Sequence, residues 1–214
     1  MQTITIGSNT YNLCAMPSTP APASIEIGMN DTVAVNTSPF TRAEQTQRWP
    51  SGDFWDSTVT LPPMTWQEAA AWEGFLAELQ GRGNVLQLGD PRKSGVQGTA
   101  LGTPVVNTTG SNNIPGTTAL ETAEWQNNEN GLLLPGDRFQ VGLRLYMVCE
   151  SVSSDASGIA TITVWPSIRE TPANATPLVL TSPQGLFRLA TNRRALQASP
   201  ARGTMMSFKC TEAR

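Results

Sequence analysis

Paired carboxylates are the side chains in this sequence with the clearest catalytic potential. A glycosidase needs two of them, one protonated and one ionised, and it needs no imidazole. The candidates are Glu68, Glu73, Glu121, Glu124 and Asp137. Structural roles account better for these residues, because Glu68 completes a T-x-x-E capping box and Asp137 follows Pro-Gly at a turn position. We therefore expect that the protein is not an enzyme.

The absence of histidine narrows the chemistry further. With 0 His in 214 residues, a Ser-His-Asp triad, a Cys-His pair and every metal site that needs imidazole are excluded. The G-x-S-x-G and P-loop motifs are also missing. The segment that begins at Gly81 fails the G-x-G-x-x-G pattern, because Leu86 takes the last glycine position. We predict no catalytic residues, no metal and no cofactor.

The three cysteines, Cys14, Cys149 and Cys210, are far apart and form no C-x-x-C motif. This spacing favours buried free thiols over a disulfide framework or a zinc site. Residues 1–15 show neither a basic segment nor a long apolar one, so we expect no signal peptide. We expect synthesis in a reducing cytosol.

Charge and hydropathy limit the partners. The net charge of −3 and the pI of about 5.0 provide no basic surface for phosphates, so we expect no direct contact with nucleic acid. No run approaches the roughly 20 apolar residues that span a bilayer, so we expect no membrane insertion.

Six tryptophans suggest two kinds of site. Their rings could stack on sugars, which would make a carbohydrate-binding module. Large aromatic side chains also dominate protein cores and subunit interfaces, and this second interpretation fits their placement in predicted strands and a predicted helix. We therefore predict core or interface anchors at Trp49, Trp55, Trp72, Phe75, Leu79, Trp125 and Trp165.

The elements that position these side chains are mostly strands. Only 14% of the residues are charged, while the chain has 18 Gly and 16 Pro, a composition that suits short strands and turns. One helix is predicted over 65–80, with Thr65 and Glu68 at its start and an apolar stripe formed by Trp72, Phe75, Leu76 and Leu79. The order of strands, one helix and more strands predicts a mainly β fold in which the helix packs on a sheet.

The pattern of apolar and polar residues predicts the individual strands and one hairpin. Short strands are predicted at 3–6, 11–15, 24–27, 32–35 and 85–88. Residues 45–49 and 54–61 flank Pro-Ser-Gly-Asp and are predicted to form a hairpin. Residues 95–130 are predicted to be loop with short strands, and 138–150 a strand with either a bulge near Gly142 or burial on both faces. Further strands are predicted at 159–165, 185–190 and 205–211.

Several of these segments resemble a known family. The sequences LPGDRFQVG, LYMV and SDASGIATITVWPSIR, at 134–142, 145–148 and 154–169, are similar to a module of tail and tail-tip proteins of tailed bacteriophages. In that module a P-G-D turn opens a strand, a hairpin tip carries D-A-S-G-x-A-T, and a strand ends in W-P-x-(I/L)-R. Residues 207–213 resemble the terminal strand of such proteins. The layout of the opening half is similar to the hub domain of distal tail proteins.

The resemblance implies a structural virion protein without catalytic residues. It implies a β-sandwich or barrel hub domain, formed by 1–94 and 183–214 with the helix at 65–80, and an inserted small β domain at 95–182. It also implies a ring of identical subunits, a hexamer, that connects the tail tube to the hub and the receptor-binding apparatus. The expected partners are other copies of the chain, the tail tube protein and hub or tip proteins. A carbohydrate-binding module for host attachment and a His-free glycoside hydrolase remain the alternatives.

Overall fold

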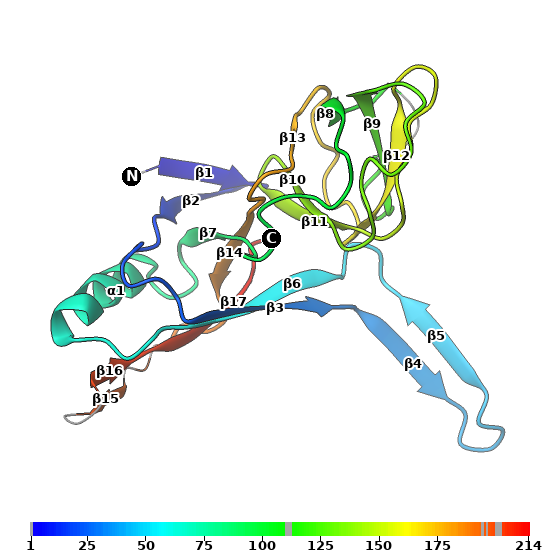
Figure 1. Ribbon diagram of the computed structural model, residues 1–214. Coiled ribbons are helices and arrows are strands. Elements are labelled where there is room, and N and C mark those ends of the chain that lie inside the picture. The colour runs from blue at the N-terminus through cyan, green and yellow to red at the C-terminus, as the bar shows by residue number, and fades with distance from the viewer. Residues whose placement is uncertain (1, 110–112, 194, 196, 200–202) are drawn as a thin grey trace. The chain divides into compact units, whose positions relative to one another are not determined.

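The computed structural model describes residues 2–109, 113–193, 195, 197–199 and 203–214. They form two compact units, drawn in Figure 1. The first unit contains Met1–Gly28, Trp55–Arg92 and Gln184–Arg214, and the second contains Met29–Phe54 and Lys93–Pro183. The described residues are mainly β with one helix, which confirms the predicted fold class.

The first unit is built on a seven-stranded mixed sheet. The register of β2 with β7 is parallel, whereas β1–β2, β7–β14, β14–β17 and β17–β6 are antiparallel. Ile4 and Ile6 on β1 are buried, as their alternation predicts. The strands in sheet order are β1 (Gln2–Ile6), β2 (Asn9–Cys14), β7 (Val85–Leu88), β14 (Gly185–Leu189), β17 (Ser207–Glu212), β6 (Phe54–Thr60) and β3 (Ser24–Asn30).

Helix α1 (Trp66–Glu78) begins and ends close to the predicted 65–80. Thr65 is the N-cap, and both hydrogen bonds of the capping box with Glu68 are present. The ring of Trp72 meets Phe75 edge-on, with centroids 5.8 Å apart, and lies 6.2 Å from Phe208 on β17. The helix therefore buries its aromatic stripe against the sheet, which an amphipathic helix needs in order to be stable.

The second unit contains a six-stranded antiparallel sheet that nearly closes into a barrel. Its first and last strands approach one another, because Val105 bridges Pro177 and the N–H of Val106 donates to the carbonyl of Thr176 over 2.8 Å. A core of apolar side chains fills it, including Phe139, Tyr146 and Ile162. The strands in sheet order are β13 (Leu178–Val179), β10 (Arg138–Val141), β11 (Arg144–Val148), β12 (Ala160–Trp165), β9 (Ala119–Trp125) and β8 (Gly102–Val106).

Two antiparallel pairs lie outside these sheets. β4 (Val33–Thr37) pairs with β5 (Glu44–Arg48), and β15 (Gln197–Ser199) pairs with β16 (Gly203–Met205). The β4–β5 pair belongs to the second unit. Most of the predicted strand at 205–211 is β17, on which Phe208 and Cys210 are buried; Met205 ends β16, and Met206 between the two strands is buried.

The predicted hairpin of 45–49 with 54–61 is wrong. β5 pairs with β4, whereas β6 pairs with β17 and has β3 on its other side. The reason is the burial pattern of β6: Trp55, Ser57 and Val59 point into the core of the first unit, while every residue of β5 is exposed. If β6 paired with the fully exposed, polar β5, as predicted, its face with Trp55 and Val59 would not be buried.

Of the two explanations predicted for 138–150, the bulge near Gly142 is wrong, because the chain turns there, whereas both faces of β10 and β11 do carry buried residues. Val141 pairs with Arg144, so Gly142 and Leu143 form a two-residue hairpin turn. Gly142 has a φ of +56°, a conformation that such turns require and that glycine adopts at little cost. The switch in side-chain parity along 138–150 therefore comes from two strands rather than one.

The two units divide the chain slightly differently from the predicted domains. The predicted borders of the insertion, 95 and 182, lie two residues and one residue inside those of Lys93–Pro183. Met29–Phe54 belongs with the second unit, although it was expected in the hub domain. The segment 95–130, predicted as loop with short strands, contains the short strand β8 and also the longer, seven-residue β9.

Candidate functional site: an exposed hairpin and its anchor

The most unusual feature of the second unit is the hairpin of residues 33–48, which we call the arm. Its strands pair in register from Val33–Arg48 to Thr37–Glu44. All ten strand residues are exposed, so neither face covers a core. An isolated two-stranded hairpin is marginally stable in water, and one that buries nothing depends on its base or on a partner.

The arm presents apolar side chains to solvent. Phe40, in the turn between the strands, is 94% exposed, and Val35 on β4 is 55% exposed. Val33 and Val35 share one face, where their cross-strand neighbours are Arg48 and Thr46. Single exposed apolar residues are common, but several on one thin element suggest a contact surface.

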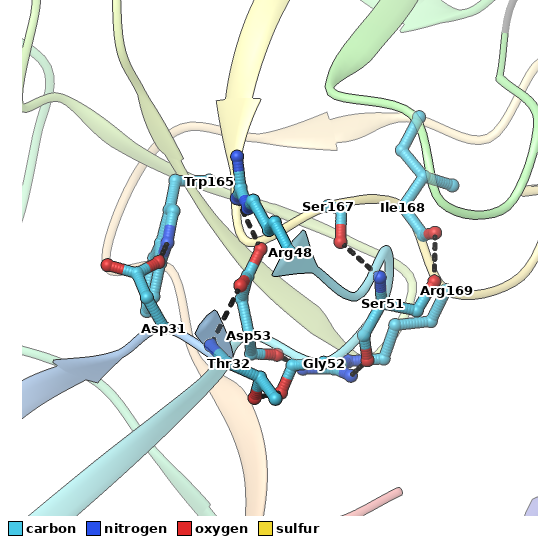
Figure 2. A network of polar contacts seen from close by, with 10 residues as sticks. All are labelled: Asp31, Thr32, Arg48, Ser51, Gly52, Asp53, Trp165, Ser167, Ile168 and Arg169. Atoms are coloured by element: carbon cyan, nitrogen blue, oxygen red, sulfur yellow. Dashed lines mark hydrogen bonds and ion pairs between the residues drawn. The ribbon is translucent and has the colours of Figure 1, made fainter. Parts of the chain in front are cut away.

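Asp53 holds the base of the arm, as Figure 2 shows. Its side chain is fully buried and accepts a hydrogen bond from Arg48 Nη2 over 2.6 Å and one from the N–H of Thr32 over 3.4 Å. The hydrogen bond and the charge of Asp53 raise the pKa of Arg48. Thr32 precedes β4 and Arg48 is the last residue of β5, so a single carboxylate ties the two ends of the arm together.

The segment after β12 supplies the other half of this anchor (Figure 2). Arg169 Nη1 donates to the carbonyl of Ser51 over 2.8 Å, and Nη2 donates to the carbonyl of Asp53. The N–H of Ser51 donates to Ser167 Oγ over 2.9 Å, and Ser51 Oγ donates to the carbonyl of Ile168 over 3.4 Å. These bonds join residues more than 110 positions apart and fix the chain between β5 and β6.

Two further contacts complete the anchor. Trp165 Nε1 donates to Asp31 Oδ1 over 2.8 Å, and Thr32 Oγ1 donates to the carbonyl of Gly52 over 2.9 Å. A Cβ atom on Gly52 would lie 2.7 Å from Thr32 Cβ, so the close approach needs glycine. The base of the arm is thus held by one polar network. Its members are Asp31, Thr32, Arg48, Ser51, Gly52, Asp53, Trp165, Ser167, Ile168 and Arg169.

The structure separates the predicted anchor side chains by burial. In the first unit Trp55, Trp72, Phe75 and Leu79 are buried in the core. In the second unit Trp125 and Trp165 are buried, and Trp125 Nε1 donates to Thr122 Oγ1 over 2.8 Å. Trp49 is 46% exposed at the base of the arm. The predicted set therefore does not meet in one place.

Four of the five candidate carboxylates accept hydrogen bonds, Glu124 from Thr103 Oγ1 over 3.4 Å, while Glu73 is exposed on α1. Asp137 is fully buried and accepts from the N–H groups of Gln97, Gly98 and Leu134. Glu121 accepts from Asn107 Nδ2 over 2.7 Å. Glu68 accepts from the N–H and the hydroxyl of Thr65, which lower its pKa. Asp137 therefore holds a turn, and Glu68 caps the start of α1.

The thiols divide into two kinds. Cys14 and Cys210 are buried as predicted, and burial raises the pKa of Cys14 to about 11 and that of Cys210 to about 12. Cys149 is exposed, contrary to the prediction, because side chains alternate and its neighbour Val148 takes the buried position on β11. All three are free cysteines.

The described part of the chain contains no cluster of three or more Cys, Asp or Glu residues that could hold a metal ion. No helix within it has both the length and the apolar character to cross a membrane. Arg193 is exposed, and Arg194 lies outside the described residues.

The arm and its anchor were not singled out from the sequence. Residues 32–35 were predicted to be a strand, but the exposed Phe40 and the role of Asp53 were missed. The available signal was local: an S-P-F-T turn between a short β-branched segment and the fully polar segment EQTQR. The contacts with Ser167 and Arg169 have no local signal.

Comparison with known proteins finds neither a protein-family model nor a curated protein that this sequence matches.

Proposed function

We propose that this chain is a structural protein of a bacteriophage tail tip. Copies of it form a ring that connects the tail tube to the hub or the receptor-binding apparatus. Its partners are other copies of itself, the tail tube protein and hub or tip proteins, and its work is assembly rather than catalysis. The resemblance to tail-tip proteins suggests this role and a ring of six.

The observation that carries this proposal is the arm. A hairpin with ten exposed strand residues and a 94% exposed Phe40 at its turn gains little stability from its own fold. The anchor nevertheless holds its base with an ion pair between the half-exposed Arg48 and the buried Asp53 and with several long-range hydrogen bonds. A hairpin that is anchored at its base and buries neither face is suited to adding strands or side chains to another subunit.

The positions of the motifs also favour the proposal. The segment 134–142 contains β10, 145–148 covers β11 except for its first residue, and 154–169 contains β12. These three strands are neighbours in the barrel-like sheet. The segments that resemble the phage module thus form neighbouring strands of one sheet.

The direct test is localisation. Antibodies against the chain, with gold labels, are applied to intact virions of a phage whose genome encodes it, and the tails are imaged by electron microscopy. Gold confined to the tail tip, together with ring-shaped particles of the purified protein on tail tubes, supports the proposal. Absence of the chain from purified virions by mass spectrometry would contradict it.

A carbohydrate-binding module for host attachment is the second candidate, favoured by two exposed rings. Trp66 at the start of α1 is 76% exposed, and Trp49 is 46% exposed. Glycan-array binding that disappears in Trp66→Ala or Trp49→Ala would support this function, because sugars stack on exposed aromatic faces. Equal signals for both variants and the wild type would argue against it.

A further inference from the structure

The turn of the arm, residues 38–43, is internally hydrogen-bonded. The N–H of Ser38 donates to the carbonyl of Ala43 over 2.9 Å, and the N–H of Arg42 donates to the carbonyl of Ser38 over 3.0 Å. The Oγ1 of Thr41 accepts from the N–H of Ala43 over 3.3 Å. The turn therefore presents Phe40 in a preformed shape, which reduces the entropy lost on binding.

The turn also carries an unpaired cation. Arg42 forms no ion pair with any residue in the described ranges. Its φ of +55° places it in the left-handed region, which non-glycine residues adopt rarely. Phe40 and Arg42 together give the turn an apolar group and a positive charge two residues apart.

The first unit contains a pocket with the matching chemistry. It has a volume of about 500 Å³ and lies between the ends of β2 and α1, within the range of about 300–1,000 Å³ typical of ligand pockets. Leu13, Cys14 and Met16 form its apolar part, and Glu78 is its carboxylate; Gln2, Ala15, Gln87 and Gln184 complete the lining. Like the turn, the pocket combines apolar side chains with one charged group, and the two charges are opposite.

None of the described residues that line this pocket supplies a cation to Glu78. It is the last residue of α1, whose final turn contains no basic residue, so its charge adds to the negative end of the helix dipole. Asn84 donates to its backbone carbonyl over 2.8 Å, not to its carboxylate. Cys14 beside it stays neutral at physiological pH, because burial and Glu78 raise the pKa of the thiol. A guanidinium at this point would offset an unfavourable local charge.

We propose that the turn of the arm of one copy docks into this pocket of a second copy, with Phe40 against Leu13 and Met16 and Arg42 paired with Glu78. The inference rests on the proposed self-assembly and names its contact. Two different surfaces meet, so the interface is heterologous and generates a ring when the rotation closes.

A second pocket fits this occupant less well. It has a volume of about 230 Å³, with Leu76, Leu189 and Phe208 as its apolar part. Arg193 and Lys209 also line it, and both would repel Arg42. This pocket provides an internal comparison for the experiment below.

Disulfide trapping tests the contact. In a Cys149→Ser background, tagged copies with Phe40→Cys are mixed with untagged copies carrying Met16→Cys, oxidised, and separated on a non-reducing gel. We expect a mixed dimer of tagged and untagged chains. A Thr191→Cys partner, which lines the second pocket, should give none.

The outcomes separate this contact from the proposed function. If the wild type forms oligomers but the variants give no disulfide between positions 40 and 16, the docking mode is overturned and self-assembly is not. The same holds if the variants instead form disulfides between positions 40 and 191 or between two copies of position 40. A wild-type chain that stays monomeric at all concentrations, and also on tail tubes, would overturn both. Because the tag distinguishes the two chains, a disulfide within one chain cannot imitate the result.

Charge exchange gives an independent readout by analytical ultracentrifugation. Arg42→Glu and Glu78→Arg should each weaken self-association about tenfold, and the double variant should return to within about threefold of the wild type. Phe40→Ala should weaken it about 30-fold, as expected for a buried aromatic anchor. Glu73→Arg, on the exposed face of α1, is the matched control and should have no effect. Lack of rescue in the double variant would contradict the pairing.

Discussion

At the scale of single residues, Asp137 organises the loop that precedes the barrel-like sheet. It accepts from the N–H groups of Gln97, Gly98 and Leu134 over 2.8, 3.3 and 2.9 Å. Asp137→Ala leaves these donors without their acceptor, so we expect the free energy of unfolding to fall by about 3 kcal/mol. Urea denaturation followed by tryptophan fluorescence measures it. Glu44→Ala, which removes an exposed carboxylate of the same unit, should change it by less than about 0.5 kcal/mol.

The burial of each cysteine predicts how readily its thiol reacts. With Ellman's reagent at pH 8, we expect one thiol to react in the native protein, Cys149, and three after denaturation. Cys149 reacts slowly, because partial burial and Glu150 raise its pKa, whereas burial raises the pKa of Cys14 to about 11 and of Cys210 to about 12. Rapid reaction of two thiols in the native state would contradict this assignment.

The same shifts determine how stability changes in alkali. An unfolded cysteine ionises near pH 8.5, so the raised native pKa values stabilise the fold below about pH 8.5. This contribution is lost as the pH rises through the native values near 11 and 12. We expect the free energy of unfolding to fall more steeply between pH 9 and 11 in the wild type than in Cys210→Ala. Parallel slopes in urea titrations would show that Cys210 is not the cause.

At the scale of elements, helix α1 depends on its first turn. Thr65→Ala removes the hydroxyl that accepts from the N–H of Glu68 over 3.4 Å, and we expect a loss of about 1 kcal/mol of stability. Thr65→Ser keeps the hydroxyl and should restore most of it. The interaction with Thr65 lowers the pKa of Glu68. The stability that the ionised carboxylate adds to the cap is therefore lost as the pH falls through that pKa. Urea denaturation at neutral pH compares the variants.

The arm depends on its anchor in the same way. Asp53→Asn removes the charge that Arg48 Nη2 meets at 2.6 Å, so we expect the backbone amides of 33–48 to exchange about tenfold faster with deuterium, as local opening becomes easier. Hydrogen–deuterium exchange with mass spectrometry measures this. Glu44→Gln is the control on the same hairpin, and exchange unchanged by Asp53→Asn would assign the order of the arm to other contacts.

The elements that the sequence predicts well are those with local causes. The T-x-x-E box and the stripe of Trp72 and Phe75 place α1 within two residues of its observed ends, because capping and packing act over one or two turns. The hairpin at 45–61 failed because β6 pairs with β17, about 150 residues away. The anchor was missed for the same reason, since Asp31 meets Trp165 across 134 positions. Long-range pairing leaves no periodic signal.

At the scale of the whole molecule, weak charge favours association. Only 14% of residues are charged and the net charge is −3, so copies repel each other little, and low net charge generally promotes self-association. If Arg42 and Glu78 supply the main charged contact, the dissociation constant should change less than about tenfold between 50 and 500 mM salt, because one ion pair is screened modestly. Light scattering across this range measures it, and a change of several hundredfold would indicate a largely electrostatic interface.

Removing the turn of the arm tests what the assembly needs from this element. Replacing residues 38–43 by Asn-Gly joins Thr37 to Glu44, which pair directly, through a two-residue turn that hairpins favour. The strands and the anchor remain, so we expect the stability of the monomer in urea to stay within about 1 kcal/mol of the wild type. We expect the oligomer to be lost at concentrations where the wild type assembles. If it persists in light scattering, the faces and edges of β4 and β5, rather than Phe40, hold the copies together.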